Sequence, residues 1–104
     1  MAPKTNRRVL ILLAEDDEED RMMIKEAFAE SHLLNELRFV DDGEELMDYL
    51  LRRGKYNDPH LSPRPGMILM DLNMPRKDGR EALREIKASM ELRQIPIVVL
   101  TTSS

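Results

Sequence analysis

Apolar residues occur along the chain in short uninterrupted runs separated by amphipathic stretches. The runs at 9–13 and 67–70 contain no polar residue, the pattern of strands buried on both faces of a parallel sheet. Residues 36–39 alternate polar with apolar, which predicts a half-exposed edge strand. A last run at 95–100 has Pro96 near its start, where a missing donor is tolerated, and its residues are also expected to be buried on both faces.

Helical spacing of apolar residues predicts one helix after each of the first three strands. Acidic residues open the first helix at Asp17, where negative charge suits the positive end of the helix dipole. Asp42-Gly43 opens the second helix and Asp78-Gly79 opens the third. The expected inward-facing residues are Met23, Ile24, Ala27 and Phe28, then Leu46, Met47, Leu50 and Leu51, then Ala82, Leu83, Ile86 and Met90.

Strands and helices therefore alternate along the chain, which predicts an α/β fold with a parallel sheet and right-handed crossovers. Segment 54–66 contains three prolines and two glycines and is expected to be a loop. At roughly a dozen residues it exceeds the usual helix-to-strand connection of about 2–6, and such loops tend to be functional or mobile.

Composition narrows the class of protein. The 104 residues predict one domain, 1–104, and the net charge of −4 with mixed signs argues against a nucleic-acid partner. The chain has no cysteine, which excludes disulfides and thiolate metal sites and suits a cytoplasmic location. The apolar runs are far shorter than a membrane span, so no membrane partner is expected.

Acidic residues follow both strands that are expected to be central. Glu15, Asp16 and Asp17 come after the first, and Asp71 ends the other. Because neighbouring parallel strands end at the same edge of a sheet, these carboxylates should gather there. Like charges raise one another's pKa unless a cation neutralises them. Oxygen-only ligands indicate a hard cation, and a small carboxylate cluster with open positions favours Mg²⁺ over Ca²⁺. The alternative is an ordinary acidic first turn of a helix.

Asp71 is expected at a strand-to-loop corner, because a strand cannot continue through Pro75. It is either a turn-forming residue or a nucleophile that attacks a phosphorus centre to form an acyl phosphate. Asn73 could offer a backbone carbonyl to the ion, and the Thr101 hydroxyl, at the end of the last strand, should reach the same edge.

Three blocks of sequence together resemble the receiver domain of two-component response regulators. The resemblance implies a flavodoxin-like, doubly wound parallel sheet with strand order 2-1-3-4. It also implies that Asp71 is the phospho-acceptor, that Glu15, Asp16, Asp71 and Asn73 form the Mg²⁺ site with Asp17 as an extra acid, and that Thr101 is the switch residue. The blocks are Leu12-Leu13-Ala14-Glu15-Asp16-Asp17, Asp71-Leu72-Asn73-Met74-Pro75 with Asp78-Gly79, and Pro96-Ile97-Val98-Val99-Leu100-Thr101-Thr102.

The long loop and residues 76–80 are similar to stand-alone receivers that work with phytochrome-type sensor kinases. The partner implied is therefore a sensor histidine kinase, and the chain is expected to accept a phosphoryl group rather than to act as an enzyme. An aspartyl-phosphate hydrolase would need an acid where Asn73 stands. The two histidines, His32 and His60, lie outside the acidic cluster and are expected on the surface.

Receivers continue with a fourth helix, a fifth strand and a fifth helix, so this chain is expected to be a receiver truncated after its fourth strand. No lysine matches the family's phosphate-pairing lysine, since Lys77 and Lys87 belong to the third helix region. An open edge at the fourth strand predicts a homodimer, formed through that edge or by exchange of elements. The alternative function is a self-associating fragment with little or no phosphorylation activity.

Overall fold

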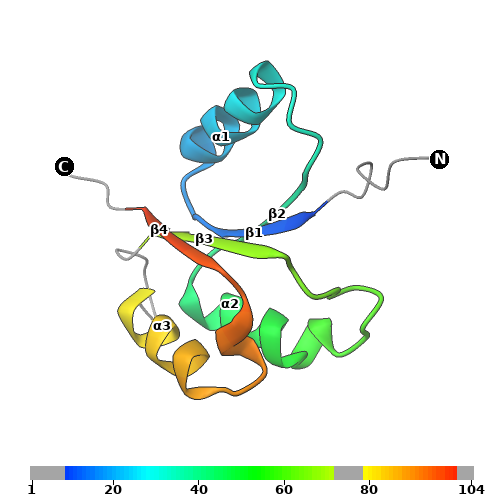
Figure 1. Cartoon of the computed structure of the whole chain (residues 1–104), viewed down its shortest axis with the longest axis vertical. Helices are drawn as coiled ribbons and strands as arrows, with labels where there is room; N and C mark the ends of the chain where they lie inside the picture. The colour runs from blue at the N-terminus through cyan, green and yellow to red at the C-terminus, as the bar shows by residue number, and fades with distance from the viewer. Residues whose placement is uncertain (1–8, 72–78, 101–104) are drawn as a thin grey trace.

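The computed structural model of the chain describes residues 9–71 and 79–100, and its centre is a four-stranded parallel sheet. The strand order is β2-β1-β3-β4, as predicted (Figure 1). The edge position of β2 is also as predicted, because among the described strands β2 pairs only with β1. The strands are β1 (Leu10–Ala14), β2 (Glu36–Val40), β3 (Met67–Asp71) and β4 (Ile97–Leu100).

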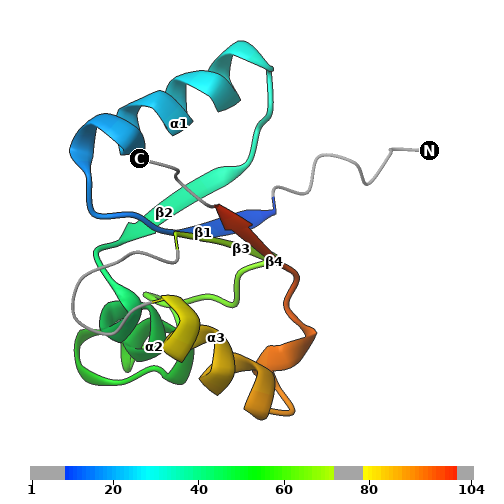
Figure 2. The ribbon, with the colours of Figure 1, turned by 90° about the vertical axis from the view of Figure 1, so that its left-hand side faces the viewer.

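Helices cover the sheet unequally. Figure 2 shows α1 on one face and both α2 and α3 on the other, which makes three layers. The side chains of Asp17 and Asp42 cap the N-termini of α1 and α2. Asp17 accepts from two backbone N–H groups of α1, and Asp42 accepts from the Glu45 N–H of α2. The helices are α1 (Glu18–Glu30), α2 (Gly43–Leu51) and α3 (Gly79–Ala88), with short 3-10 turns η2 (Gly54–Tyr56) and η3 (Leu92–Gln94).

The main hydrophobic core lies between the sheet and the pair α2 and α3. Two residues that were expected to face inward on this side of the sheet lie outside the core: Leu51 is 45% exposed and Met90, beyond the end of α3, is 74% exposed. Tyr49, which the periodicity did not select, is buried in the core, and its hydroxyl donates to the Pro63 carbonyl 2.7 Å away. The buried cluster consists of Leu10, Leu12, Ala14, Val40, Leu46, Met47, Tyr49, Leu50, Ile68, Met70, Ala82, Ile86 and Leu92.

The α1 face is packed more loosely than predicted. No residue of α1 is buried, and Met23, expected to face inward, is 64% exposed. The helix instead lies toward the β2 side of the sheet, where the Arg21 guanidinium and the Lys25 ammonium sit over the Phe39 ring. The expectation that β4 is buried on both faces is also wrong: Val98 and its neighbour Val99 are 43% and 36% exposed.

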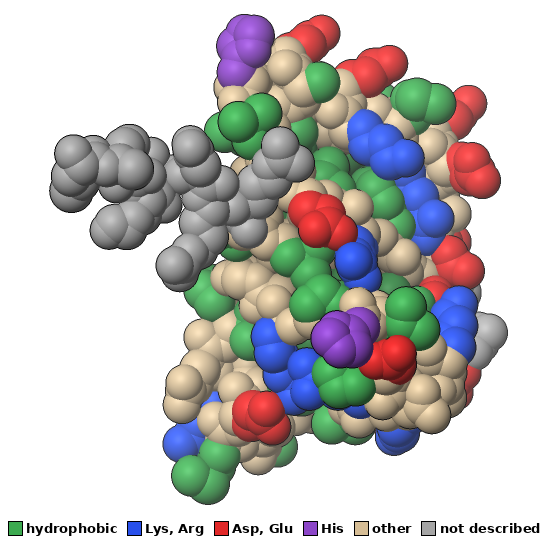
Figure 3. Space-filling view, turned by 90° about the vertical axis from the view of Figure 1, so that its right-hand side faces the viewer, with side chains coloured by type: hydrophobic (Ala, Val, Ile, Leu, Met, Phe, Trp, Pro, Cys, Tyr) green, Lys and Arg blue, Asp and Glu red, His purple; other side chains and the backbone are tan. Residues whose placement is uncertain are grey.

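Segment 54–66 is anchored to the domain by side chains. The Ser62 side chain is fully buried, and its hydroxyl donates to the Tyr56 carbonyl over 2.9 Å. Arg38 donates to the Leu61 carbonyl and Arg52 to the Ser62 carbonyl. Figure 3 shows Lys and Arg side chains interspersed with Asp and Glu side chains on this side of the molecule. Among the described residues, no helix is long and apolar enough to cross a membrane.

Candidate functional site

Two buried carboxylates lie where adjacent strands end. Ala14 of β1 pairs with Met70 of β3, so Glu15 and Asp71 follow at neighbouring positions along the same edge of the sheet. Glu15 is 6% exposed and Asp71 is 9% exposed. The juxtaposition predicted from the strand pattern is therefore present at the carboxyl ends of the two central strands.

Glu15 is held through its backbone and through its side chain. Its N–H donates to the Val40 carbonyl (3.0 Å), which ties the end of β1 to the end of β2. Its carbonyl accepts from Arg21 Nε at 2.5 Å, and its Oε2 accepts from the Asp17 N–H at 3.1 Å. These bonds give the turn after β1 a defined geometry.

The electrostatics of the edge are unfavourable for an ionised Glu15. Burial raises the pKa of Glu15 above its ordinary value of 4.5, and the carboxylates of Asp20, Asp71 and Asp16 raise it further, although the bond from the Asp17 N–H opposes them. A cation bound at this edge would relieve both costs. Carboxylate oxygens are the donors that Mg²⁺ takes, so the chemistry of these residues fits that ion.

The remaining acids of the predicted metal site differ in role or in exposure. Asp16 is exposed to solvent, whereas Asp17 acts as the N-cap of α1, with its Oδ1 accepting from the Glu19 N–H over 2.8 Å. Across residues 9–71 and 79–100, no three Asp, Glu, His or Cys side chains are already gathered closely enough to hold a metal ion. Asn73 lies outside the described residues.

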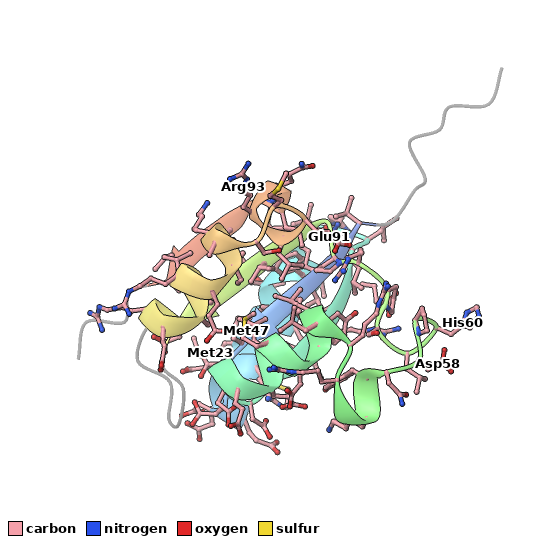
Figure 4. The ribbon with its side chains drawn as sticks, turned by 90° about the horizontal axis from the view of Figure 1, so that it is seen from below. Met23, Met47, Asp58, His60, Glu91 and Arg93 are labelled. Atoms are coloured by element: carbon pink, nitrogen blue, oxygen red, sulfur yellow. The ribbon has the colours of Figure 1, made fainter. Side chains whose placement is uncertain are left out.

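Strand β4 ends beside the same edge. Asp71 pairs with Leu100, the last residue of β4, while Thr101 lies outside the described residues. The two histidines are exposed, as predicted, and Figure 4 shows His60 with Asp58 at the outer end of the loop that follows α2.

A second group of charged residues lies beside β2, and the sequence did not predict its contacts. Arg21 Nη2 contacts Asp41 Oδ1 at 2.6 Å, and Glu45 accepts from the Asp41 N–H and from the Tyr56 hydroxyl. No sequence signal marked Arg21, because an arginine in an acidic helix looks like an ordinary surface residue. A cavity of about 400 Å³ adjoins this group and is lined by Asp41, Asp42, Glu45, Asp48, Lys55 and Tyr56.

Several relatives align with nearly the whole chain, among them two regulatory proteins. Response regulator Rcp1 of Synechocystis is 45% identical over 103 residues, which are 99% of this chain and 68% of Rcp1. The probable methanogenesis regulatory protein FilR2 of Methanothrix harundinacea is 39% identical over 95 residues, which are 91% of this chain and 59% of FilR2. The chain thus spans about two thirds or less of the length of these relatives.

Solved structures agree with the observed fold. The phosphorylated cyanobacterial phytochrome response regulator RcpA superposes with a TM-score of 0.83 at 46% identity, covering 93% of this chain and 67% of RcpA. The Mn²⁺-bound form of Rcp1 superposes with a TM-score of 0.82, also at 46% identity, covering 91% and 66%. The family model for the response regulator receiver domain matches residues 11–104. The chain therefore belongs to the response regulator receiver family, the signalling modules of two-component systems, and has their flavodoxin-like fold.

Proposed function

We propose that this chain accepts a phosphoryl group on Asp71, with Mg²⁺ held by Glu15, Asp16, Asp71 and Asn73. The observation that carries the proposal is the burial of Asp71 at the end of β3, directly beside Glu15 at the end of β1. Open α/β sheets bind ligands in the crevice outside the carboxyl ends of their strands, and Asp71 is the last residue of β3.

The proposed reaction is a transfer from a phosphohistidine of the kinase. A P–O bond forms to an Asp71 oxygen as the P–N bond breaks, and the imidazole retains that electron pair. When bound, Mg²⁺ neutralises charge on the carboxylate and on the incoming phosphoryl oxygens. Thr101 is the proposed switch residue, and the pairing of Leu100 with Asp71 supports this role because Thr101 is next in the chain.

The proposed phosphoryl donor is a sensor histidine kinase of the phytochrome type. Support for this donor comes from the similarity to RcpA, a phytochrome response regulator whose structure is of the phosphorylated form. The Mn²⁺-bound form of Rcp1 supports the proposed divalent-cation site. Residues 1–104 are proposed to act as one receiver unit in the cytoplasm, without enzymatic turnover of a small-molecule substrate.

Incubation with acetyl phosphate and Mg²⁺, followed by intact mass spectrometry, tests the proposal. We expect a mass increase of one phosphoryl group that disappears when Mg²⁺ is chelated and in Asp71→Asn. The matched control is Asp48→Asn, an equal change at a residue of α2 that pairs with Arg53. An adduct that persists in Asp71→Asn would contradict the assignment of the acceptor, and no adduct on the unmodified chain would contradict the function.

A second candidate function is self-association, favoured by the exposure of Val98 and Val99 on β4, which pairs within the described residues only with β3. A second copy that pairs with this edge would extend the sheet beyond β4 and place a strand beside both valines in a symmetric dimer. Light scattering at micromolar concentration tests it. A dimer that Val98→Lys converts to a monomer supports pairing through β4, whereas a monomeric unmodified chain contradicts self-association.

A further inference from the structure

Arg21 connects α1 to the ends of two strands. Its Nε donates to the Glu15 carbonyl over 2.5 Å, and its Nη2 lies 2.6 Å from Asp41 Oδ1. Its guanidinium carbon lies 5.1 Å from the centre of the Phe39 ring, which places the guanidinium over an aromatic face. The side chain is 23% exposed, so much of it is covered by these partners.

The bonded carbonyl belongs to the peptide that joins Glu15 to Asp16. On the other side of Glu15, its N–H donates to the Val40 carbonyl at 3.0 Å. Both backbone polar groups of Glu15 are thus occupied, and the direction in which the next residue leaves the strand depends on the contact with Arg21. Asp16 is exposed, so packing does not hold its side chain in place as burial holds that of Glu15.

We propose that Arg21 is a positioning residue for the cation site: it fixes the peptide between Glu15 and Asp16, and so the separation of their carboxylates. The inference rests on the proposed function, since it assigns Arg21 a task within that Mg²⁺ site. Groups that orient metal ligands without touching the metal typically change metal affinity about 10–100-fold when they are removed.

The geometry requires a guanidinium. One donor is directed at the Glu15 carbonyl and another at the Asp41 carboxylate, and a planar fork can serve both at once. A lysine ammonium carries the same charge on a flexible stem and lacks this fixed pair of donor directions. Charge and geometry can therefore be separated by substitution.

Calorimetric titration of the full chain with Mg²⁺ tests the proposal, together with thermal unfolding in the absence of metal. We expect Arg21→Gln to weaken Mg²⁺ binding about 10-fold. The matched control is Lys25→Gln, since Lys25 lies one turn further along α1 and over the same Phe39 ring, 5.5 Å from its centre. This control removes the same charge and should leave the Mg²⁺ dissociation constant unchanged.

Two further variants make the result decisive. Arg21→Lys should show most of the loss of Mg²⁺ affinity expected for Arg21→Gln. An Arg21→Lys variant that binds Mg²⁺ as tightly as the unmodified chain would mean that charge alone matters, and would overturn the positioning role. Asp41→Asn removes only the second anchor and should give an intermediate loss, which tests the proposal if Arg21→Gln does not fold.

The outcomes distinguish this inference from the function on which it rests. If Arg21→Gln lowers the unfolding temperature but binds Mg²⁺ like the unmodified chain, Arg21 is merely structural and the inference fails alone. An equal loss in Lys25→Gln would also overturn it. If the unmodified chain itself gives no Mg²⁺ binding, the proposed function and this inference fail together.

Discussion

The two faces of the sheet are stabilised in different ways. On one face, α2 contributes five buried residues and α3 contributes three, and six of these eight belong to the hydrophobic cluster that also contains residues of β1 and β3. On the other face, α1 contributes none, and its contact with the sheet includes cationic side chains over Phe39. Buried apolar area stabilises a fold by roughly 25 cal/mol per Å², so most of the stability lies on the α2 and α3 face.

This difference between the two faces affects the candidate cation site, because residues of the loosely packed α1 side hold the acidic edge of the sheet in place. Asp17 caps α1, and Arg21 of α1 holds the Glu15 carbonyl. Substitutions on α1 should therefore alter the site with little effect on global stability. Substitutions in the core under α2 and α3 should lower global stability with little effect on the site. Three substitutions test this contrast between the faces, from the largest expected effect on stability to the smallest.

The largest effect is expected from Leu46→Ala on α2. Leu46 has no exposed surface, and removing its side chain leaves a cavity between α2 and the sheet. We expect a loss of about 2–5 kcal/mol in the free energy of unfolding, measured by urea titration. A loss below about 1 kcal/mol would show that this face is not the main source of stability.

An intermediate, pH-dependent effect is expected from Tyr56→Phe. Burial opposes ionisation of Glu45, but the bonds from the Tyr56 hydroxyl, the Asp41 N–H and Lys55 outweigh it and hold the pKa of Glu45 below 4.5. The unfolded chain then binds more protons than the folded chain near pH 4, so this stabilisation is present above about pH 4.5 and is lost as pH falls further.

Removing the Tyr56 hydroxyl should therefore cost about 1 kcal/mol at neutral pH. Urea unfolding at a series of pH values should show the two proteins converging as the solution is acidified below the ordinary Glu45 pKa of 4.5. A difference that does not vary with pH would mean that Tyr56 acts through packing and not through its bond to Glu45.

The smallest effect is expected from Met23→Ala on α1. With 64% of its surface exposed, Met23 has little apolar area to lose, and the substitution should change the free energy of unfolding by less than about 0.5 kcal/mol. A loss comparable to that of Leu46→Ala would show that α1 packs more tightly in solution than the contrast between the faces implies.

The strands were accessible from the sequence because each depends on a local pattern, whereas their order was implied by the resemblance to the receiver family. The unbroken apolar runs marked β1 and β3 as central, and parallel topology alone then brings Glu15 and Asp71 together. The inward stripe of α1 was not accessible: helical spacing selected Met23, but burial depends on how closely the helix approaches the sheet. The prediction that Met90 faces the core was wrong because α3 ends at Ala88, so helical spacing does not apply at position 90.

Sequence by itself thus determined the α/β order, the family and the acidic residues at the ends of two strands, since these follow from periodicity and from motifs that are contiguous in the chain. Only the tertiary structure decided that segment 54–66 is anchored through Arg38 and Arg52, and that Arg21 joins Glu15 to Asp41. Those contacts join residues up to 23 positions apart in the sequence. A hydrogen bond across such a separation depends on the path of the folded backbone, which no local pattern encodes.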